Sequence, residues 1–427
     1  MDVIDERVIL TIRYLFSPKT HLSYQQSFLS YHIKITRTMK YNIFVLLLIS
    51  LTSSMAMAAS RYNIVSYGAK PGGRTDSSKA LLAAWTQACA SREAATLYVP
   101  KGKFAVSKTV SFDGPCKNNA IVFQINGTLS APSDYNVIGN SEEWIIFRHV
   151  KGVTVSGGIL DGQGSGLWSC KNSGKSCPTG ATSLKFANSN NIIITGLTSI
   201  NSQMFHIVIN ECQDVTVQGA KISALEESPN TDGIHIGGST KVNIFDSNIG
   251  TGDDCVSVGP GSSNLWIQKV ICGPGHGISI GSLGKDVQEK GVRNVTVTNC
   301  TFTGTKNGVR IKTWGRPSNS FATDIHFQHA IINNVKNPII IDQNYCDGNN
   351  NCPRQASGVK ISDVTYKNIH GSSATEVAVK FDCSKTHPCS GIKLQDIELT
   401  YHNQPTKATC TNADGIALGI LQPTSCL

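Results

Sequence analysis

A short strand-like segment recurs along the chain, and this repeat limits the possible folds more than any other feature. Each copy follows a Gly, Asn, Asp or Lys and alternates apolar with polar residues. Such alternation is typical of a half-buried strand, and the Gly and Asn residues between copies favour turns. The copies begin at Gly152, Asn191, Asp214, Lys241, Asn264, Asn294, Asp324, Gly358 and Gly391.

The intervals between the apolar positions of these copies range from 23 to 39 residues. Strand repeats of this length predict a solenoid, in which each coil buries its apolar side chains against the next. We therefore expect one all-β domain over residues 59–427, a right-handed parallel β-helix. A two-sheet sandwich is the alternative, but its strands recur about every 8–12 residues in hairpins, and few hairpin turns are visible here.

One helix is predicted ahead of the repeats, over Ser77 to Ala90, with Asp76 as its N-cap. It precedes the first coil, where the open end of a solenoid must be covered. We expect it to cap the β-helix.

The N-terminal region predicts secretion. The apolar run from Ile43 to Leu51 is too short for a bilayer, which needs about 20 residues. Lys40 precedes this run and Ala56-Met57-Ala58 follows it, as in a signal peptide. We interpret residues 39–58 as the signal peptide and residues 1–38 as an extension that the secreted protein lacks. An uncleaved membrane anchor is the alternative.

All 14 cysteines follow residue 58, where an oxidising compartment favours disulfides. A zinc site is the alternative, but no C-x2-C pair is present. Cys212 and Cys300 lie inside strand-like repeats and are candidates for free, buried thiols. The close pairs are Cys170/Cys177, Cys255/Cys272, Cys346/Cys352, Cys383/Cys389 and Cys410/Cys426.

The charge balance excludes some partners. Charged residues make up only 16% of the chain, and the formal net charge is +9. No run of Lys or Arg indicates nucleic-acid binding, whereas a polyanionic substrate is compatible with a mildly basic protein. Sequons at Asn126, Asn294 and Asn299 are possible glycan sites in an extracellular protein.

A second alignment within the coils brings acidic residues together. Asp232, Asp254 and His276 are separated by two equal intervals of 22 residues. Equivalent positions of successive coils lie about 4.8 Å apart, so these three residues are predicted to form one column. Asp253 adds a third carboxylate. Arg310 and Lys312 follow one coil later.

Three carboxylates so close together cannot all ionise easily, so at least one pKa is expected to rise. A protonated carboxyl beside ionised ones is the arrangement that glycoside hydrolysis uses. The cation pair would then bind a substrate carboxylate. The alternative is a structural ladder of Asp and Asn residues at the β-helix turns.

These motifs resemble those of polygalacturonases, family 28 of the glycoside hydrolases, which have the pectin-lyase-like β-helix. The matching stretches are Asn230-Thr231-Asp232, Gly252-Asp253-Asp254-Cys255, Gly275-His276-Gly277 and Arg310-Ile311-Lys312, with further matches at Tyr67-Gly68-Ala69, Asp161-Gly162-Gln163-Gly164 and Tyr345.

The resemblance implies an extracellular hydrolase of the cell wall that cleaves α-1,4-galacturonosyl links of pectin with inversion. It implies that Asp253 is the general acid, that Asp232 and Asp254 activate water, and that His276 supports the acid. Arg310 and Lys312 would hold the uronate carboxylate, and Asn230 and Tyr345 would contact the sugar. No cofactor, metal, nucleic acid or membrane is expected as a partner, and a monomer is expected.

The sequence is more similar to the pollen-type exo-polygalacturonases of plants than to endo-acting enzymes. Four alternatives stay open: an endo-polygalacturonase, a rhamnogalacturonan hydrolase, a calcium-dependent pectate lyase and a non-catalytic β-helix. The lyase would use the acidic cluster as a calcium site.

Overall fold

The computed structural model describes residues 60–346, 352–353 and 355–427. The predicted extension (1–38) and signal peptide (39–58) lie outside these residues. Residues 59–427 form one compact unit. Within the described residues, no helix is both long and apolar enough to cross a membrane.

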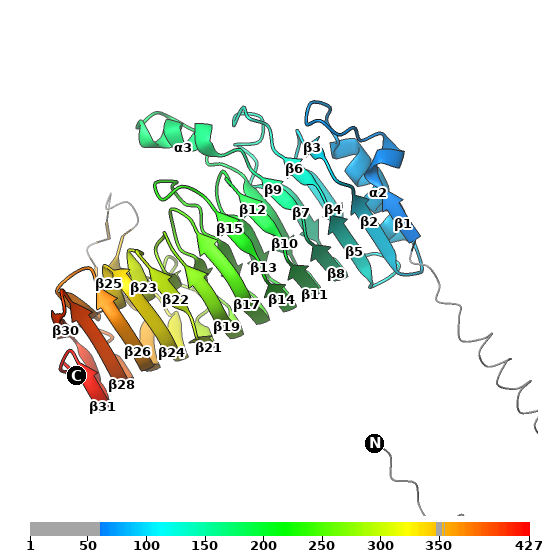
Figure 1. Ribbon diagram of the computed structural model, residues 1–427. Helices are drawn as coiled ribbons and strands as arrows, with labels where there is room; N and C mark the ends of the chain where they lie inside the picture. The colour runs from blue at the N-terminus through cyan, green and yellow to red at the C-terminus, as the bar shows by residue number, and fades with distance from the viewer. Residues whose placement is uncertain (1–59, 347–351, 354) are drawn as a thin grey trace, which may run out of the picture. The chain divides into compact units, whose positions relative to one another are not determined.

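The chain winds into coils that build two long sheets, as Figure 1 shows. The pairings between coils are parallel, and each strand pairs with the equivalent strand of the neighbouring coil, so the order of the 11-stranded sheet follows the chain. Sheet B has 11 strands: β4 (Val110–Asp113), β7 (Glu143–Arg148), β10 (Thr182–Ala187), β13 (Ile207–Asn210), β16 (Ile234–Gly237), β18 (Val256–Val258), β20 (Ile278–Leu283), β23 (Asn307–Trp314), β25 (Asn337–Tyr345), β27 (Val377–Asp382) and β30 (Lys407–Thr411).

Sheet A is the larger sheet and contains the predicted repeats. Its antiparallel pairing, between β28 and β29, lies in the last coils. Its 20 strands are β1 (Ser60–Asn63), β2 (Ala95–Val99), β3 (Lys103–Ala105), β5 (Ile121–Ile125), β6 (Thr128–Ser130), β8 (Lys151–Ser156), β9 (Ile159–Asp161), β11 (Asn190–Thr195), β12 (Thr198–Ile200), β14 (Gln213–Gln218), β15 (Lys221–Ser223), β17 (Thr240–Gly250), β19 (Ser263–Cys272), β21 (Val292–Thr298), β22 (Thr301–Thr303), β24 (Phe321–Val335), β26 (Lys360–Ser373), β28 (Cys389–Tyr401), β29 (Gln404–Pro405) and β31 (Ala413–Gln422).

The register of sheet A corrects one copy of the repeat. Val364, rather than Val359, pairs with Ile325 of β24 and with Ile392 of β28. The preceding turn residue is therefore Asp363, whose φ is 55°, and not Gly358. The error has a physical source: β26 alternates apolar residues on both sides of Asp363, so either frame satisfies the sequence pattern.

Left-handed residues explain why Asn and Asp recur where the coils enter sheet A. Asn191, Asn264 and Asn294 have φ values of 54°, 56° and 53°. Asn and Asp adopt this conformation more easily than most residues. The Asn294 side chain also donates a hydrogen bond to Asn264 Oδ1 at 2.7 Å. The structural ladder considered above therefore occurs at this turn.

The predicted helix caps the first coil. Helix α2 (Ser78–Ala90) begins after Ser77, which is the N-cap in place of Asp76. Asp76 nevertheless accepts a hydrogen bond from the Ser78 backbone N–H at 3.1 Å. A second helix that the sequence did not predict, α3 (Ser165–Asn172), lies in an excursion after β9.

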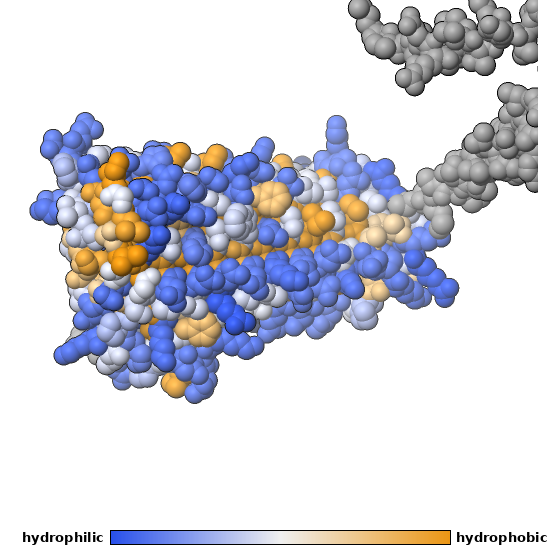
Figure 2. Space-filling view, turned by 90° about the horizontal axis from the view of Figure 1, so that it is seen from below, coloured by the Kyte–Doolittle hydropathy of each residue, from blue (hydrophilic) through white to orange (hydrophobic). Residues whose placement is uncertain are grey.

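The interior is filled by aligned apolar side chains. The Phe147 ring lies 4.7 Å from the rings of both Phe112 and Phe186, which occupy equivalent positions in sheet B. Trp85 of α2 extends this stack, at 5.1 Å from Phe112. The helix thus closes the core with an aromatic contact. Apolar side chains are also aligned on the outer surface. Figure 2 shows them as a narrow apolar stripe that runs along the coils between polar bands.

Six disulfides are present among the described residues. They include all five predicted pairs and Cys89–Cys116, which the sequence spacing did not suggest. Cys212 and Cys300 are free and buried, as expected.

Candidate active site

The two 22-residue intervals stack in register. Ile234, Val256 and Ile278 pair with one another in β16, β18 and β20. Asp232, Asp254 and His276 each lie two residues before these positions. The structure therefore brings the predicted column together at the start of three adjacent strands of sheet B. Ligand atoms of Asp253, Asp254 and His276 all lie within 4.8 Å of one another.

Asp254 is held in its ionised form by its neighbours. Its carboxylate is fully buried and accepts hydrogen bonds from Arg310 Nη2 at 2.7 Å and from Lys312 Nζ at 2.8 Å. Ser279 donates a third hydrogen bond at 2.8 Å. Burial alone would raise the pKa of Asp254, but Arg310 and then Lys312 lower it to about 2.

Asp232 has the opposite environment. Burial, followed by the negative charges of Asp253 and Asp254, raises the pKa of Asp232 well above its ordinary value. The Ser257 hydroxyl donates a hydrogen bond to Asp232 Oδ2 at 2.6 Å. Ser257 Oγ also lies 2.8 Å from His235 Nδ1. A continuous hydrogen-bonded chain therefore links Asp232 to the His235 imidazole.

Asp253 is the member of the cluster that faces open space. Its Oδ1 lies 2.9 Å from His276 Nδ1 and accepts the Asp254 backbone N–H at 2.8 Å. Its Oδ2 has no hydrogen bond within the described residues. Asp253 and His276 both line a cavity of about 360 Å³. Asp253 can thus reach a bound molecule directly.

Arg310 and Lys312 differ from the simplest expectation, in which both would be free for substrate. Each is only 7% exposed, and each directs charge to Asp254. Arg310 still lines the cavity beside Asp253, whereas Lys312 is not among its lining residues. Lys306, which the sequence did not single out, also lines it and makes no ion pair within the described chain.

The two remaining predicted residues, Tyr345 and Asn230, lie in different surroundings. Tyr345 lines the same cavity, and its ring centroid lies 5.0 Å from Lys312 Nζ. Asn230 lies in an exposed turn with a φ of 54° and lines neither of the cavities at the column. Its role in contacting sugar stays a prediction.

Backbone contacts hold the carboxylates in place. The Thr231 hydroxyl accepts the Gly252 N–H at 3.1 Å and lies 2.7 Å from Ser228 Oγ. A Cβ at Gly252 would lie 2.0 Å from the Ser228 carbonyl oxygen, so only glycine fits there. The turns that carry Asp232 and Asp253 are thereby fixed to each other.

A single row of side chains forms the floor of a groove across the column. The members of this row, which we call the floor row, are equivalent residues in successive strands of sheet B. The floor row consists of Lys185, Val208, His235, Ser257, Ser279, Arg310 and Ile340.

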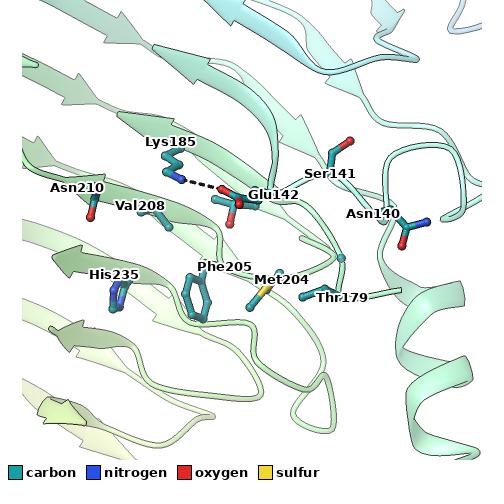
Figure 3. Close-up of a pocket in the computed structure, with 12 residues that line it drawn as sticks. Asn140, Ser141, Glu142, Thr179, Lys185, Met204, Phe205, Val208, Asn210 and His235 are labelled. Atoms are coloured by element: carbon teal, nitrogen blue, oxygen red, sulfur yellow. Dashed lines mark ion pairs between the residues drawn. The ribbon is translucent and has the colours of Figure 1, made fainter. Parts of the chain in front are cut away.

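Two cavities lie along the floor row on either side of Ser257 and Ser279. The upstream cavity, of about 510 Å³, contains Lys185, Val208 and His235 (Figure 3). The downstream cavity, of about 360 Å³, contains Arg310 and Ile340 together with Asp253. A linear substrate could therefore extend across the carboxylate column.

Few oxygen atoms of the cluster are free to bind a cation. Ca²⁺ takes about six to eight oxygen ligands. Both oxygens of Asp254 already accept hydrogen bonds from Arg310, Lys312 and Ser279. This arrangement fits the support of an ionised carboxylate better than it fits metal binding.

Comparison with known proteins identifies the family. The profile of Glycosyl hydrolases family 28 matches residues 89–426. The chain belongs to this family. A polygalacturonase of Prunus persica is 61% identical over 90% of this chain and 97% of its own length. An exopolygalacturonase of Platanus acerifolia is 46% identical over 83% of this chain and 94% of its own length.

Solved structures show the same fold. An endo-xylogalacturonan hydrolase from Aspergillus tubingensis matches with a TM-score of 0.73 and 22% identity, over 84% of this chain and 99% of its own. The likeness confirms the expected right-handed parallel β-helix. As a family 28 member, the chain is a glycoside hydrolase.

Sequence reasoning missed the groups that surround the family 28 carboxylates. No role was predicted for Ser257 or Ser279, which occupy polar positions of alternating strands. A signal was their place between His235 and Arg310 in the floor row, which becomes visible once the 22-residue step is applied from His235 to Ser257 and then to Ser279.

Proposed function

We propose that this glycoside hydrolase is an extracellular polygalacturonase, which hydrolyses α-1,4-galacturonosyl links of pectin with inversion and removes units from a chain end. The observation that carries this proposal is the division of the carboxylates. Asp254 is held ionised, the pKa of Asp232 is raised, and Asp253 opens to a cavity. Acid and base chemistry need carboxyl groups with such different environments.

In this proposal Asp253 donates a proton to the leaving glycosidic oxygen, because it is the carboxyl with an oxygen free toward the cavity. His276 orients it through Oδ1. Asp232 takes the proton of the attacking water. A raised pKa makes Asp232 a stronger base than an ordinary carboxylate, and Ser257 stabilises its ionised form.

The uronate carboxylate is assigned to the downstream cavity. Arg310 uses Nη2 and Nε for Asp254 and Ser279, so Nη1 remains for a ligand. Lys306 offers a second cation there. A paired, planar donor group next to a free ammonium suits a carboxylate.

The mode of attack and the location rest on less direct support. The Platanus relative carries the name exopolygalacturonase, and the resemblance of the sequence to pollen-type exo-polygalacturonases favours the same mode. Secretion is supported by the signal-peptide pattern at 39–58 and by six disulfides, which are typical of an oxidising compartment.

Digestion of polygalacturonate tests the proposal. We expect new reducing ends, with galacturonate monomer as the only early product, and inverted configuration in the product by NMR. A ladder of oligomers would replace the exo assignment with an endo one. Retained configuration would contradict the roles of the carboxylates, and no release at all would contradict the function.

The carboxylate–imidazole cluster leaves one second candidate, a calcium-dependent lyase. Products that absorb in the ultraviolet and activity that disappears with chelator would select it. Hydrolysis that continues in excess chelator, without such absorption, supports the hydrolase.

A further inference from the structure

A cavity at the capped end of the coils is rich in basic side chains. This cavity, which we call the basic cavity, measures about 470 Å³ and is formed by the segment after α2, the loop before β5 and the turn between β7 and β8. Its basic side chains are Arg92, Lys117, His149 and Lys151, and no Asp or Glu of the described chain lines it. It shares no lining residue with the two cavities along the floor row, so it is separate from the candidate active site.

The positive charges of the basic cavity have no anionic partner. Arg92, Lys117 and Lys151 are exposed and make no ion pair within the residues that the structure describes. By contrast, the exposed Lys241 of a later coil lies 3.6 Å from Asp214. The charge of the basic cavity is therefore available to a ligand.

Two acidic residues are near in sequence but do not pair with these cations. Glu93 follows Arg92, and Asp113 precedes the loop that carries Lys117. Neither acid lines the basic cavity or forms an ion pair there within the described chain. Cations that line one cavity without an acid repel one another, and a bound anion relieves this repulsion.

The loop before β5 is fixed to the end of α2. Cys116 of the loop forms a disulfide with Cys89 of the helix. The Asn118 side chain donates hydrogen bonds to the carbonyl oxygens of Ala88 at 3.0 Å and Ser91 at 2.9 Å. These bonds satisfy carbonyl groups that the end of a helix leaves without a partner. The lysine of this loop lies between the two anchors.

Close backbone contacts join this loop to the next coil. A Cβ at Gly152 would lie 1.8 Å from the Asn119 carbonyl oxygen, and a Cβ at Gly114 would lie 2.1 Å from that of His149. Both positions therefore require glycine, and the turn that carries Lys151 packs directly against the loop. The basic side chains thus come from a rigid backbone framework, which limits the entropy lost when a ligand binds.

A smaller, uncharged cavity continues from the basic cavity along sheet A. It measures about 280 Å³ and shares the lining residues Ala94, Asn119 and Ala120 with the basic cavity. It extends over β2, β5, β8 and β11, which follow one another from the end that α2 caps (Figure 1). Its floor is a row of residues that pair in register on these strands: Thr96, Val122, Thr154 and Ile193. Successive strands lie about 4.8 Å apart, so the two cavities together suit an elongated ligand better than a single small anion.

We propose that the basic cavity is a second, non-catalytic binding site for polygalacturonate, which holds the enzyme on its polymeric substrate. The choice of this ligand rests on the proposed function. Carboxylates of a run of galacturonate units pair with Arg92, Lys117 and Lys151, and the uncharged faces of the sugar rings lie along the smaller cavity. A polymer held there has a higher effective concentration at the groove of the same molecule.

Retention of the secreted enzyme on cross-linked polygalacturonate tests the site. The Asp253→Asn variant is the starting point, so that the gel is not digested during the measurement. Adding Lys117→Gln and Lys151→Gln is expected to weaken retention about three- to tenfold at low salt, the size expected for two exposed ionic contacts. The difference should shrink in about 0.5 M NaCl, because salt screens exposed charges.

A second measurement uses the active enzyme. On polygalacturonate, the Lys117→Gln/Lys151→Gln variant should show a raised KM and an unchanged kcat, since the second site contributes only binding. The strands β7 and β16 are three steps apart in sheet B, about 14 Å along the coils. Trigalacturonate that occupies the groove therefore does not reach the basic cavity, and its kcat/KM should stay at the wild-type value.

Lys290→Gln combined with Lys360→Gln is the matched control. Both lysines are exposed, neither makes an ion pair within the described residues, and neither lines the basic cavity or the cavities of the floor row. The control removes the same charge and should keep the wild-type retention and KM. All four lysines are exposed, so both double variants are expected to fold normally.

The outcomes separate the second site from the proposed function. If polygalacturonate is hydrolysed but the two double variants are retained equally, the second site is wrong while the function stands. If nothing is hydrolysed but retention still depends on Lys117 and Lys151, the function fails while the site stands. Vesicles that contain phosphatidylserine provide the alternative anionic surface. A Lys117→Gln/Lys151→Gln variant that loses vesicle binding but keeps its retention on the gel would assign the cavity to lipid and overturn the proposal.

Discussion

A buried carboxyl group next to other carboxyl groups keeps its proton unless a cation or a hydrogen-bond donor stabilises its charge. Asp254 has two cations, and Asp232 has one hydroxyl donor. The sequence predicted the column because a 22-residue step fixes the register. It could not predict which carboxyl ionises, since the cations come 56 and 58 residues after Asp254.

The same substitution should therefore have opposite effects on stability at the two positions. Asp254→Asn leaves Arg310 and Lys312 without their anion and should lower the free energy of unfolding by about 3–5 kcal/mol. Asp232→Asn removes a charge that the fold disfavours and should raise the melting temperature at pH 7. Both variants should be inactive. Thermal unfolding at several pH values measures the difference.

The pH dependence of these two stability effects follows from the direction of each pKa shift. The raised pKa of Asp232 makes its ionised form destabilising above the pKa of the unfolded chain, so the gain from Asp232→Asn should disappear below about pH 4. The pKa of Asp254 is lowered to about 2, so its stabilisation should be lost as the pH falls from about 4 toward 2. A gain for Asp232→Asn that persists at pH 3 would contradict this account.

Ser257 should set the acidic limit of activity. Ser257→Ala removes the donor that stabilises ionised Asp232, at a net loss of about 1.5–3 kcal/mol. The acidic limb of the kcat–pH profile should move to higher pH by about one to two units. Ser257→Thr should restore the limb to its wild-type position. Enzyme assays across pH measure the shift.

Ser199 offers a matched control for this experiment. Its Oγ also lies 2.8 Å from a histidine Nδ1, that of buried His206. His206 contacts Asp232 through the backbone, where its N–H donates to the Asp232 carbonyl oxygen at 2.8 Å, and the Ser199 hydroxyl does not bond to a carboxyl of the column. Ser199→Ala should lower the free energy of unfolding without shifting the acidic limb of the kcat–pH profile. Equal shifts in the two variants would show that the effect is structural.

At the scale of elements, a disulfide anchors the strand that follows Asp253 and Asp254. Cys255 comes directly after Asp254, and its partner Cys272 ends β19, 17 residues later. Close spacing in the sequence predicted this pair correctly, together with four others. The pair Cys89–Cys116 was missed because its 27-residue separation joins α2 to the loop before β5, a contact that no repeat encodes.

Replacement of both Cys255 and Cys272 by Ala should lower the free energy of unfolding by about 3 kcal/mol, from the loop-closure entropy of the unfolded chain. It should also lower kcat, because Asp254 is adjacent. Removal of Cys383–Cys389, six residues apart, should cost less and leave kcat unchanged. Denaturant unfolding and initial rates measure both effects, and a fall in kcat in both variants would argue against local anchoring.

At the scale of the molecule, coils contact mainly their neighbours, so the two ends determine where unfolding begins. Alternating apolar residues predicted the solenoid, and a helical segment ahead of the first coil predicted its cap. The frame at Asp363 was assigned wrongly, and helix α3 was not predicted. Either frame around Asp363 satisfies the apolar alternation, and helix α3 belongs to an excursion outside the coils.

Trp85→Ala should weaken the capped end. Trp85 is 4% exposed and packs on Phe112 and Phe147. Its loss should cost about 3–5 kcal/mol. Hydrogen exchange should quicken first in β2, β4 and β7, while kcat at low temperature stays near wild type. Uniform acceleration through β18 and β20 would mean that the coils unfold together.

The equal step between Asp232, Asp254 and His276 also limits how such an enzyme can evolve. One inserted residue between these positions would rotate a reactive group out of alignment, since each coil is hydrogen-bonded on both sides. We expect new length to be tolerated where the chain leaves the coils, as it does around α3. Lineages of this enzyme should therefore diversify through such side branches while the interval of the reactive coils stays constant.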